Sequence, residues 1–175
     1  MLTVGTDSYV TIAQADEYIS GHYTPTDERS VAWTSLSEND KEVYLRRACE
    51  ALSAIKWRGV VFKAFQPLPF PRYFGDNWDM AYYDLIAPET YIYPELTEIP
   101  NNILSAQIEE AFELACPSED TEEYEDINGA VQSYTIGHMS ETYKTAAVGS
   151  VESALRSSKA QKLVAGYAGG AYAIQ

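Results

Sequence analysis

Apolar residues recur every three or four positions in two long stretches, and this spacing predicts the two main helices of the fold. One helix is expected over residues 38–56, after Ser37 as its cap, and the other over 101–116, where Pro100 begins the helix. We expect their apolar stripes to pack against each other. The stripes are Tyr44, Leu45, Ala48, Ala51, Leu52 and Ile55 in the first, and Ile103 or Leu104, Ile108, Ala111, Phe112 and Ala115 in the second.

Two shorter helices are predicted before these. Thr11 and Gln14 make a capping box, which indicates a helix over residues 12–21. Thr26 is the predicted cap of a second short helix that runs through Trp33.

The last third of the chain has a different pattern. Residues 130–144 alternate loosely and predict a β-hairpin with its turn at Gly137–His138. A helix is predicted over 151–164, but its apolar positions are only partly periodic, and glycines follow it. We therefore expect residues 145–175 to be an extended arm that contacts a partner.

These patterns predict a mainly α fold, a small helical bundle with a β-hairpin and an extended C-terminal arm. Residues 1–128 would form the helical core, with a loop at 73–98 that is rich in aromatic and acidic residues. Residues 129–175 would form the hairpin and arm of the same domain.

The stretch from Ile55 to Arg72 connects these elements. Gly59 is placed to end the helix over 38–56, because glycine adopts a left-handed conformation without steric cost, and Trp57 would lie in the last turn. Prolines at every second position from residue 67 to 71 predict a stiff extended segment that carries Leu68 and Phe70.

Four cations of this stretch alternate with aromatic residues, a composition typical of surfaces that bind single-stranded nucleic acid. The cations are Lys56, Arg58, Lys63 and Arg72, and the aromatic residues are Trp57, Phe62, Phe65, Phe70 and Tyr73. The alternative interpretation is that the aromatic residues belong to the core and the cations surround them.

The overall charge argues against general nucleic-acid binding. The chain has 12 Lys and Arg against 26 Asp and Glu, a net charge of −14, so most of its surface should repel phosphates. Aromatic residues of the 73–98 loop and the tail are instead typical of a protein interface. The candidates are Trp78, Tyr82, Tyr83, Tyr91, Tyr93, Tyr167 and Tyr172.

The sequence contains no recognisable catalytic or metal-binding constellation. His22 and His138 have neither the spacing of a zinc site nor a place in a Ser-His-Asp arrangement, so we expect no enzyme activity, metal or cofactor. Cys49 and Cys116 are expected as buried thiols of a reduced compartment. No leader and no apolar run of membrane length is visible, which predicts a soluble protein that is made in the cytosol and not bound to membrane.

Several segments together resemble a family of tailed-phage proteins. They are Tyr9–Tyr18, Trp33, Trp57–Gly59, Gln66–Arg72 and Ile99–Pro100. The pattern covers roughly residues 7–115 and is similar to that of the head–tail connector, or adaptor, family, whose members are often labelled DnaT-like single-stranded-DNA-binding proteins. The chain departs from it in having Phe70 where a tryptophan is usual, and in a longer segment over 74–98.

The resemblance implies a structural protein of the virion neck. Its subunits would form a ring, of about twelve copies, between the portal protein and tail or neck proteins, and genome DNA would pass through it without sequence-specific binding. The alternative is an accessory protein of replication that binds single-stranded DNA.

Overall fold

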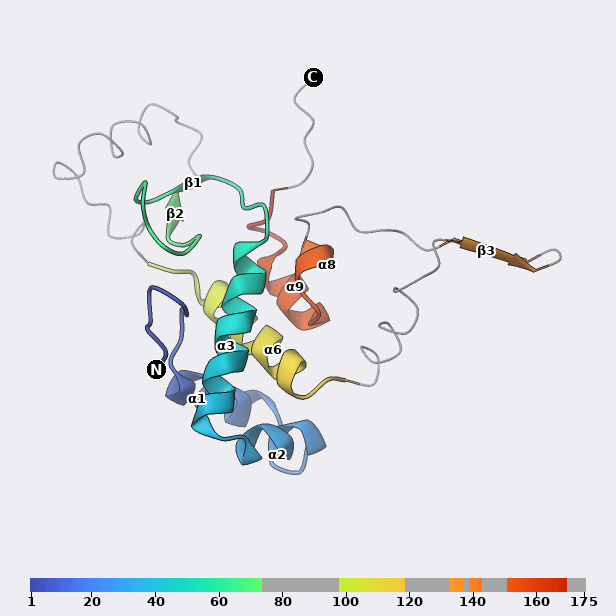
Figure 1. Ribbon diagram of the computed structural model, residues 1–175, viewed down its shortest axis with the longest axis horizontal. Helices are drawn as coiled ribbons and strands as arrows, with labels where there is room; N and C mark the ends of the chain where they lie inside the picture. Colours follow the sequence, from blue (N-terminus) through green and yellow to red (C-terminus); the bar gives the residue numbers. More distant parts are fainter. Residues whose placement is uncertain (74–97, 119–132, 137–138, 143–150, 170–175) are drawn as a thin grey trace, which may run out of the picture.

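Helix α6 (Asn101–Ala115) runs through the middle of the fold and contacts helices α1, α3 and α9 (Figure 1). The structure is a computed structural model that describes residues 1–73, 98–118, 133–136, 139–142 and 151–169. Within these ranges the chain is mainly helical, as predicted. The elements are α1 (Ile12–His22), α2 (Glu28–Ser35), α3 (Glu38–Ser53), β1 (Val60–Val61), β2 (Arg72–Tyr73), α6, β3 (Ser133–Ile136), β4 (Met139–Thr142), α8 (Val151–Ala154) and α9 (Ser158–Val164).

The predicted starts of α1 and α3 are confirmed. The Thr11 hydroxyl accepts from the Gln14 N–H at 3.2 Å, and the Gln14 side chain accepts from the Thr11 N–H at 2.8 Å. Ser37 caps α3 by accepting from the Asp40 N–H at 3.2 Å. These caps satisfy backbone donors that the first helical turn cannot pair.

The predicted cap of α2 is one residue too early. Asp27, not Thr26, precedes the helix, and its carboxylate accepts from the N–H groups of Arg29 and Ser30. The same Asp27 oxygen accepts both hydrogen bonds. The negative charge of the carboxylate is also stabilised by the partial positive charge at the N-terminus of the helix.

The predicted packing of α3 against α6 is confirmed. Leu45 and Leu52 of α3 and Phe112 of α6 are fully buried. The rings of Tyr23 and Trp33 meet Phe112 with centroids 4.6 and 6.1 Å apart. Burying each large apolar side chain stabilises the fold by roughly 1.5–3 kcal/mol, so this contact is a main source of stability.

Helix α3 ends at Ser53, so the prediction that Trp57 lies in its last turn is wrong. The chain leaves the helix because its backbone bonds elsewhere. The Arg58 N–H donates to the Tyr167 carbonyl at 2.9 Å. The Lys56 carbonyl accepts from the Gly169 N–H at 2.7 Å. These long-range bonds replace the bonds that would have continued the helix.

Gly59 has the left-handed conformation that was predicted, with φ of 72°, but it does not end α3. It lies immediately before β1, where it turns the chain into the first strand. The conformation was therefore predicted correctly and its structural role was not.

Two antiparallel strand pairs are present among the described residues. In the first, Val60 lies opposite Tyr73. In the second, Ile136 lies opposite Met139, which confirms the hairpin predicted over 130–144. Its turn, at 137–138, lies outside the described residues.

The prediction of an extended arm over 145–175 is wrong for residues 151–169. This segment forms α8 and α9, and α9 packs on α6. The single helix predicted over 151–164 is wrong, because residues 155–157 separate α8 from α9. The apolar residues therefore form one short stripe on each helix, and a continuous spacing of three or four positions does not fit both. The buried residues are Val151, Leu155, Ala160 and Val164.

None of the helices in the described part of the chain has both the length and the apolar composition needed to span a bilayer.

Candidate nucleic-acid interface

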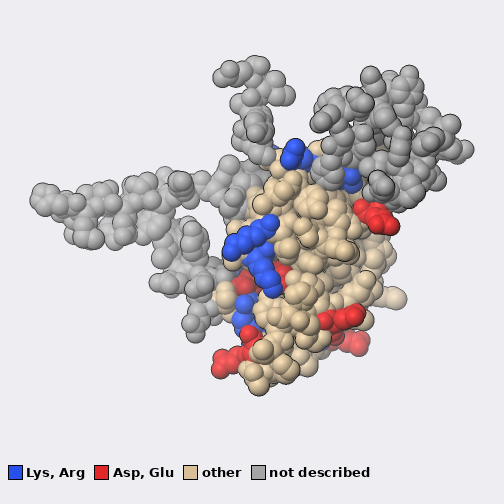
Figure 2. All heavy atoms as spheres, turned by 180° about the vertical axis from the view of Figure 1, so that it is seen from behind, with Lys and Arg blue, Asp and Glu red and all other residues tan. Residues whose placement is uncertain are grey.

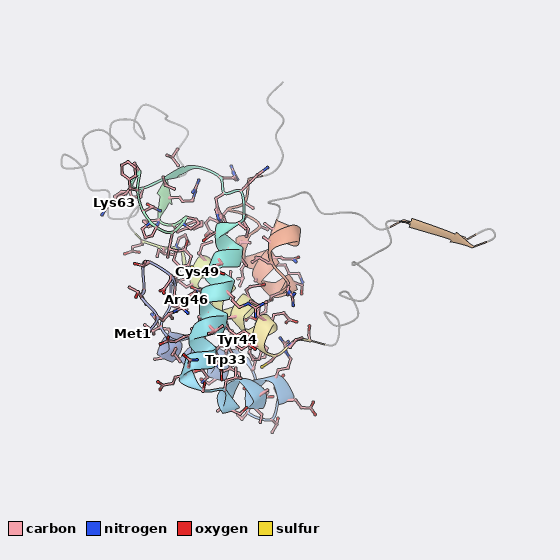
Figure 3. All side chains as sticks on the ribbon, viewed as in Figure 1. Met1, Trp33, Tyr44, Arg46, Cys49 and Lys63 are labelled. Carbon is pink, nitrogen blue, oxygen red and sulfur yellow. The ribbon has the colours of Figure 1, made fainter. Side chains whose placement is uncertain are left out.

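The loop between β1 and β2, residues 62–71, holds an aromatic side chain and a cation in solvent. Phe65 is 99% exposed, and Lys63 two positions before it is also exposed. Figure 3 shows Lys63 at the outer edge of this loop, away from α3 and α6. A single exposed apolar residue is common on protein surfaces, so the shape of the loop decides whether the pair matters.

Gln66 fixes the shape of this loop. Its side-chain oxygen accepts from the Lys63 N–H at 2.9 Å, and its side-chain nitrogen donates to the carbonyls of Leu68 and Pro71 at 2.7 and 3.0 Å. The Phe62 N–H also donates to the Pro71 carbonyl at 3.1 Å. A loop whose two sides are joined by hydrogen bonds loses less conformational entropy than a flexible loop when a ligand binds to its tip.

The proline segment anchors the loop in the core. Leu68 and Phe70 are both buried, as expected of residues on a stiff segment. Three rings meet the Phe70 ring edge-on, those of Tyr9, Trp57 and Tyr167, with centroids 6.4, 4.8 and 6.1 Å away. Only the tip of the loop is therefore presented to solvent.

Trp57 is half-buried, so the interpretation that the aromatic residues of this stretch belong to the core is confirmed in part for Trp57. Its indole N–H donates to the Leu52 carbonyl at 3.0 Å, and its ring is engaged by Phe70. Phe65, which stands in solvent, is therefore better placed for stacking than Trp57.

Arg72 holds the loop together instead of facing solvent. Its guanidinium donates to the carbonyls of Arg58, Gly59 and Pro69 at 2.8, 2.7 and 3.3 Å. Burial lowers the pKa of Arg72 from its ordinary value. Because its donors are turned to backbone carbonyls, we remove Arg72 from the four cations predicted to contact phosphates.

Lys56 and Arg58 lie on the segment that links α3 to β1. Both side chains are exposed, and neither they nor Lys63 forms an ion pair with any residue that the structure describes. The three cations therefore keep their charge available to a partner. Trp57, which lies between Lys56 and Arg58 in the sequence, forms an antiparallel β-bridge with Ala168.

The negative charge of the chain is unevenly distributed along its sequence. Eleven of the 12 Lys and Arg, but only fifteen of the 26 Asp and Glu, lie in the described ranges, an excess of four negative charges. The other eleven acids lie in 74–97 and 119–132, which contain no Lys or Arg. The expectation that most of the surface repels phosphates therefore needs correction for the described body, because its charge is close to balanced.

The arrangement of charge on one face agrees with this. Figure 2 shows Lys and Arg side chains from the upper end to the middle of the rear face, while Asp and Glu side chains gather mostly toward the lower end. The β1–β2 loop and the end of α3 lie at the upper end, and α1 and α2 at the lower end (Figure 1).

A second group of polar residues, on α6, was missed by the sequence analysis. Glu109 is buried and accepts from the hydroxyls of Tyr18 and Tyr23 at 2.8 and 2.5 Å, and it pairs with Lys159 at 2.6 Å. Burial, together with the bonded carboxylate, raises the pKa of both tyrosines. Glu109 therefore joins α1 and α9 to α6.

Two more glutamates of α6 have the same role. Glu110 accepts from the N–H groups of Arg156 and Ser157, at 3.0 and 2.9 Å. Glu113 pairs with Arg29 at 2.6 Å. Since every buried polar side-chain atom in the described part of the chain has a partner, we interpret this group as structural. Three acids within five positions of an apolar helix are the sequence signal that could have revealed it.

The candidate protein interface is largely outside the described residues. This applies to Trp78, Tyr82, Tyr83, Tyr91, Tyr93 and Tyr172. Tyr167 is described, and it is half-buried against the chain's own core, beside Phe70.

One family model matches the chain over residues 2–175, and its description is "Putative DnaT-like ssDNA binding protein". The comparison with curated proteins and that with solved structures gave no match. The match agrees with the DnaT-like label of the family that the sequence resembles, and it carries no reference to a head–tail connector.

Proposed function

We propose that this chain, which belongs to the family described as "Putative DnaT-like ssDNA binding protein", binds single-stranded DNA at its β1–β2 loop and at residues 56–58. The observation that carries the proposal is the fixed loop that holds Phe65 fully in solvent beside Lys63. Lys56 and Arg58 extend the positive charge from this loop toward the end of α3.

A single strand suits this site better than a duplex. The bases of a single strand expose their faces, and stacking on an aromatic side chain contributes about 1–3 kcal/mol per base. Lys56, Arg58 and Lys63 would contact the phosphates on either side of the stacked base. Gln66, whose amide could read a base edge, is already bonded within the loop. We therefore expect little sequence preference.

The test is the fluorescence anisotropy of a labelled oligothymidylate, titrated with the protein at several salt concentrations. Phe65→Ala should weaken binding about tenfold, because it removes the stacked ring. Lys63→Ala should weaken binding and reduce the slope of log affinity against log salt by about 0.7, as one phosphate contact is lost.

Matched controls come from the opposite end of the molecule and from α3. Val31→Ala removes an exposed apolar side chain of α2, and Arg47→Ala removes an exposed cation of α3. Both should bind like the wild type. Two results would overturn the proposal. One is a wild-type protein that does not bind oligothymidylate at low salt, and the other is a Phe65→Ala variant that binds it as tightly as the wild type.

The second candidate is a subunit of the head–tail connector, which the resemblance over residues 7–115 implies. The distribution of acids favours it, because eleven Asp and Glu without a single Lys or Arg occupy 74–97 and 119–132. In a ring beneath the portal, acidic segments facing the passage would let genome DNA slide without binding. Aromatic residues of the 73–98 loop would then contact neighbouring subunits or the portal and tail proteins.

Electron micrographs of purified particles of the tailed phage that encodes the chain separate the two candidates. The connector proposal expects an antibody against the chain to label the neck of every intact particle. The replication proposal expects the chain in infected cells and none in purified particles. Oligothymidylate binding without neck labelling would remove the connector candidate.

A further inference from the structure

We infer that the C-terminal segment 167–169 is a positioning part of the binding site, because it fixes the backbone that carries Lys56 and Arg58. The inference rests on the proposed single-stranded DNA binding and extends it. It assigns a role in DNA binding to residues more than a hundred positions away from Lys56 and Arg58 in sequence.

The contact between the two segments is close and regular. The Arg58 N–H donates to the Tyr167 carbonyl at 2.9 Å, and the Gly169 N–H donates to the Lys56 carbonyl at 2.7 Å. A Cβ atom on Gly169 would lie 3.3 Å from that Lys56 carbonyl oxygen, a tighter contact than nine in ten Cβ atoms make, so the Lys56 backbone would have to move by a few tenths of an ångström. The segment can therefore approach this closely because residue 169 is a glycine.

The same backbone is held from its other side by the loop. The Arg72 guanidinium donates to the carbonyls of Arg58 and Gly59, and Arg72 belongs to β2, which closes the loop. Residues 56–59 thus lie between the C-terminal segment and the β1–β2 loop. This arrangement sets where Lys56 and Arg58 stand relative to Lys63 and Phe65 at the tip.

The C-terminal segment owes its own position to α9. The N–H groups of Tyr167 and Ala168 both donate to the Val164 carbonyl, at 2.9 and 3.1 Å, so the segment continues directly from the end of the helix. α9 in turn packs on α6, where Glu110 accepts from the N–H groups that precede it. The spacing of the cations therefore depends on the docking of α9.

The experiment compares Gly169→Ala with Gly166→Ala. The added Cβ at residue 169 would push against the Lys56 backbone, whereas at residue 166 it would meet nothing within 4 Å. We expect Gly169→Ala to weaken oligothymidylate binding several-fold and to reduce the salt slope toward that of a Lys56→Ala, Arg58→Ala double variant. Gly166→Ala should match the wild type in both measurements, and both glycine variants should keep the far-UV circular dichroism of the wild type.

Two results would overturn the inference. One is a Gly169→Ala protein that binds like the wild type. The other is weaker binding with an unchanged salt slope, since a general loss of stability would lower affinity without removing phosphate contacts.

Failure of the proposed function would show itself differently, as a wild-type protein that does not bind the oligonucleotide at all. Amide hydrogen exchange of Arg58 then tests the positioning by itself. Faster exchange in Gly169→Ala than in Gly166→Ala would support the contact as the determinant of this backbone, and equal exchange in the two would refute it.

Discussion

At the residue scale, the buried glutamates of α6 determine how the separate segments are joined. A buried carboxylate is costly unless hydrogen bonds or a cation compensate for its lost hydration. Glu113 has an arginine partner and Glu109 a lysine partner, while Glu110 has two backbone N–H groups. Burial raises the pKa of Glu110, because the lost hydration outweighs the two N–H groups that favour its charged form.

Replacing Glu110 by Gln tests this titration. Below the ordinary pKa of 4.5, the folded and unfolded wild-type chains both carry the proton. As the pH rises, the unfolded chain loses its proton first, so this group's contribution to the free energy of unfolding falls until the folded chain has lost its proton too. Lowering the pH from neutral toward 4.5 should therefore stabilise the wild type relative to Glu110→Gln.

Urea denaturation of both proteins across this pH range measures the difference. All other titrating groups are shared, so their contributions cancel in the comparison. Two parallel profiles of the free energy of unfolding against pH would mean that Glu110 titrates alike in the folded and unfolded chains, which contradicts the raised pKa.

Local signals in the sequence predicted individual residues well, and distant contacts account for the failures. The capping box at Thr11 and the left-handed conformation of Gly59 each depend on a few neighbouring residues. The role of Arg72 depends on carbonyls up to fifteen positions away, and that of Glu110 on N–H groups more than forty positions away. A local pattern does not specify the partners of such bonds. The composition of its stretch therefore predicts Arg72 as a phosphate ligand, and three acids on an apolar helix indicate a buried polar group without identifying the N–H groups that Glu110 binds.

At the element scale, α8 and α9 are part of the core, and this reverses the expectation for a truncated protein. An extended arm could be deleted without loss of stability. Truncation after Gly149 instead removes the buried Val151, Leu155, Ala160 and Val164 and exposes the face of α6 that they cover. Loss of a buried leucine side chain such as that of Leu155 alone costs about 2–5 kcal/mol, against a typical total stability of about 5–15 kcal/mol.

We therefore expect the protein truncated after Gly149 to lose its cooperative thermal transition, as followed by circular dichroism. Truncation after Gly169 is the matched control, since it keeps both helices and the bonds to Lys56, and it should melt like the full chain. A normal melt after truncation at Gly149 would show that α8 and α9 add little to the core.

The helices themselves were predictable because their apolar stripes are long and regular. The stripes of α3 and α6 identified the central contact of the fold, including Leu45, Leu52 and Phe112. The C-terminal helices were predicted in outline, but their break at residues 155–157 disguised the stripe. Ser157 caps α9 by accepting from the Ala160 N–H. Recognising α8 and α9 as two separate helices would therefore have required a second helix start at Ser157.

At the scale of the whole molecule, charge is the property that most affects both candidate functions. The net charge of −14 suggested a surface that repels DNA, yet the described body has an excess of only four negative charges. The remaining acids are concentrated in two stretches of sequence. Repulsion from such charges acts over about one Debye length, roughly 10 Å at 0.1 M salt, so it should weaken as salt is added.

Neutralising one of the two stretches measures this repulsion. Six acids are changed to their amides, namely Glu119, Asp120, Glu122, Glu123, Glu125 and Asp126, which brings the net charge from −14 to −8. Less repulsion should speed association with oligothymidylate and raise its affinity at low salt, with little change in the dissociation rate. At about 1 M salt, where the Debye length is roughly 3 Å, the two proteins should bind alike.

Stopped-flow fluorescence at a series of salt concentrations gives both rates. Phe65→Ala provides the contrast, because loss of a stacking contact should raise the dissociation rate at every salt concentration. An association rate that is unchanged by the six amides at low salt would show that these acids do not repel the incoming strand. An effect that persists undiminished at high salt would contradict long-range repulsion, because screening should have removed it.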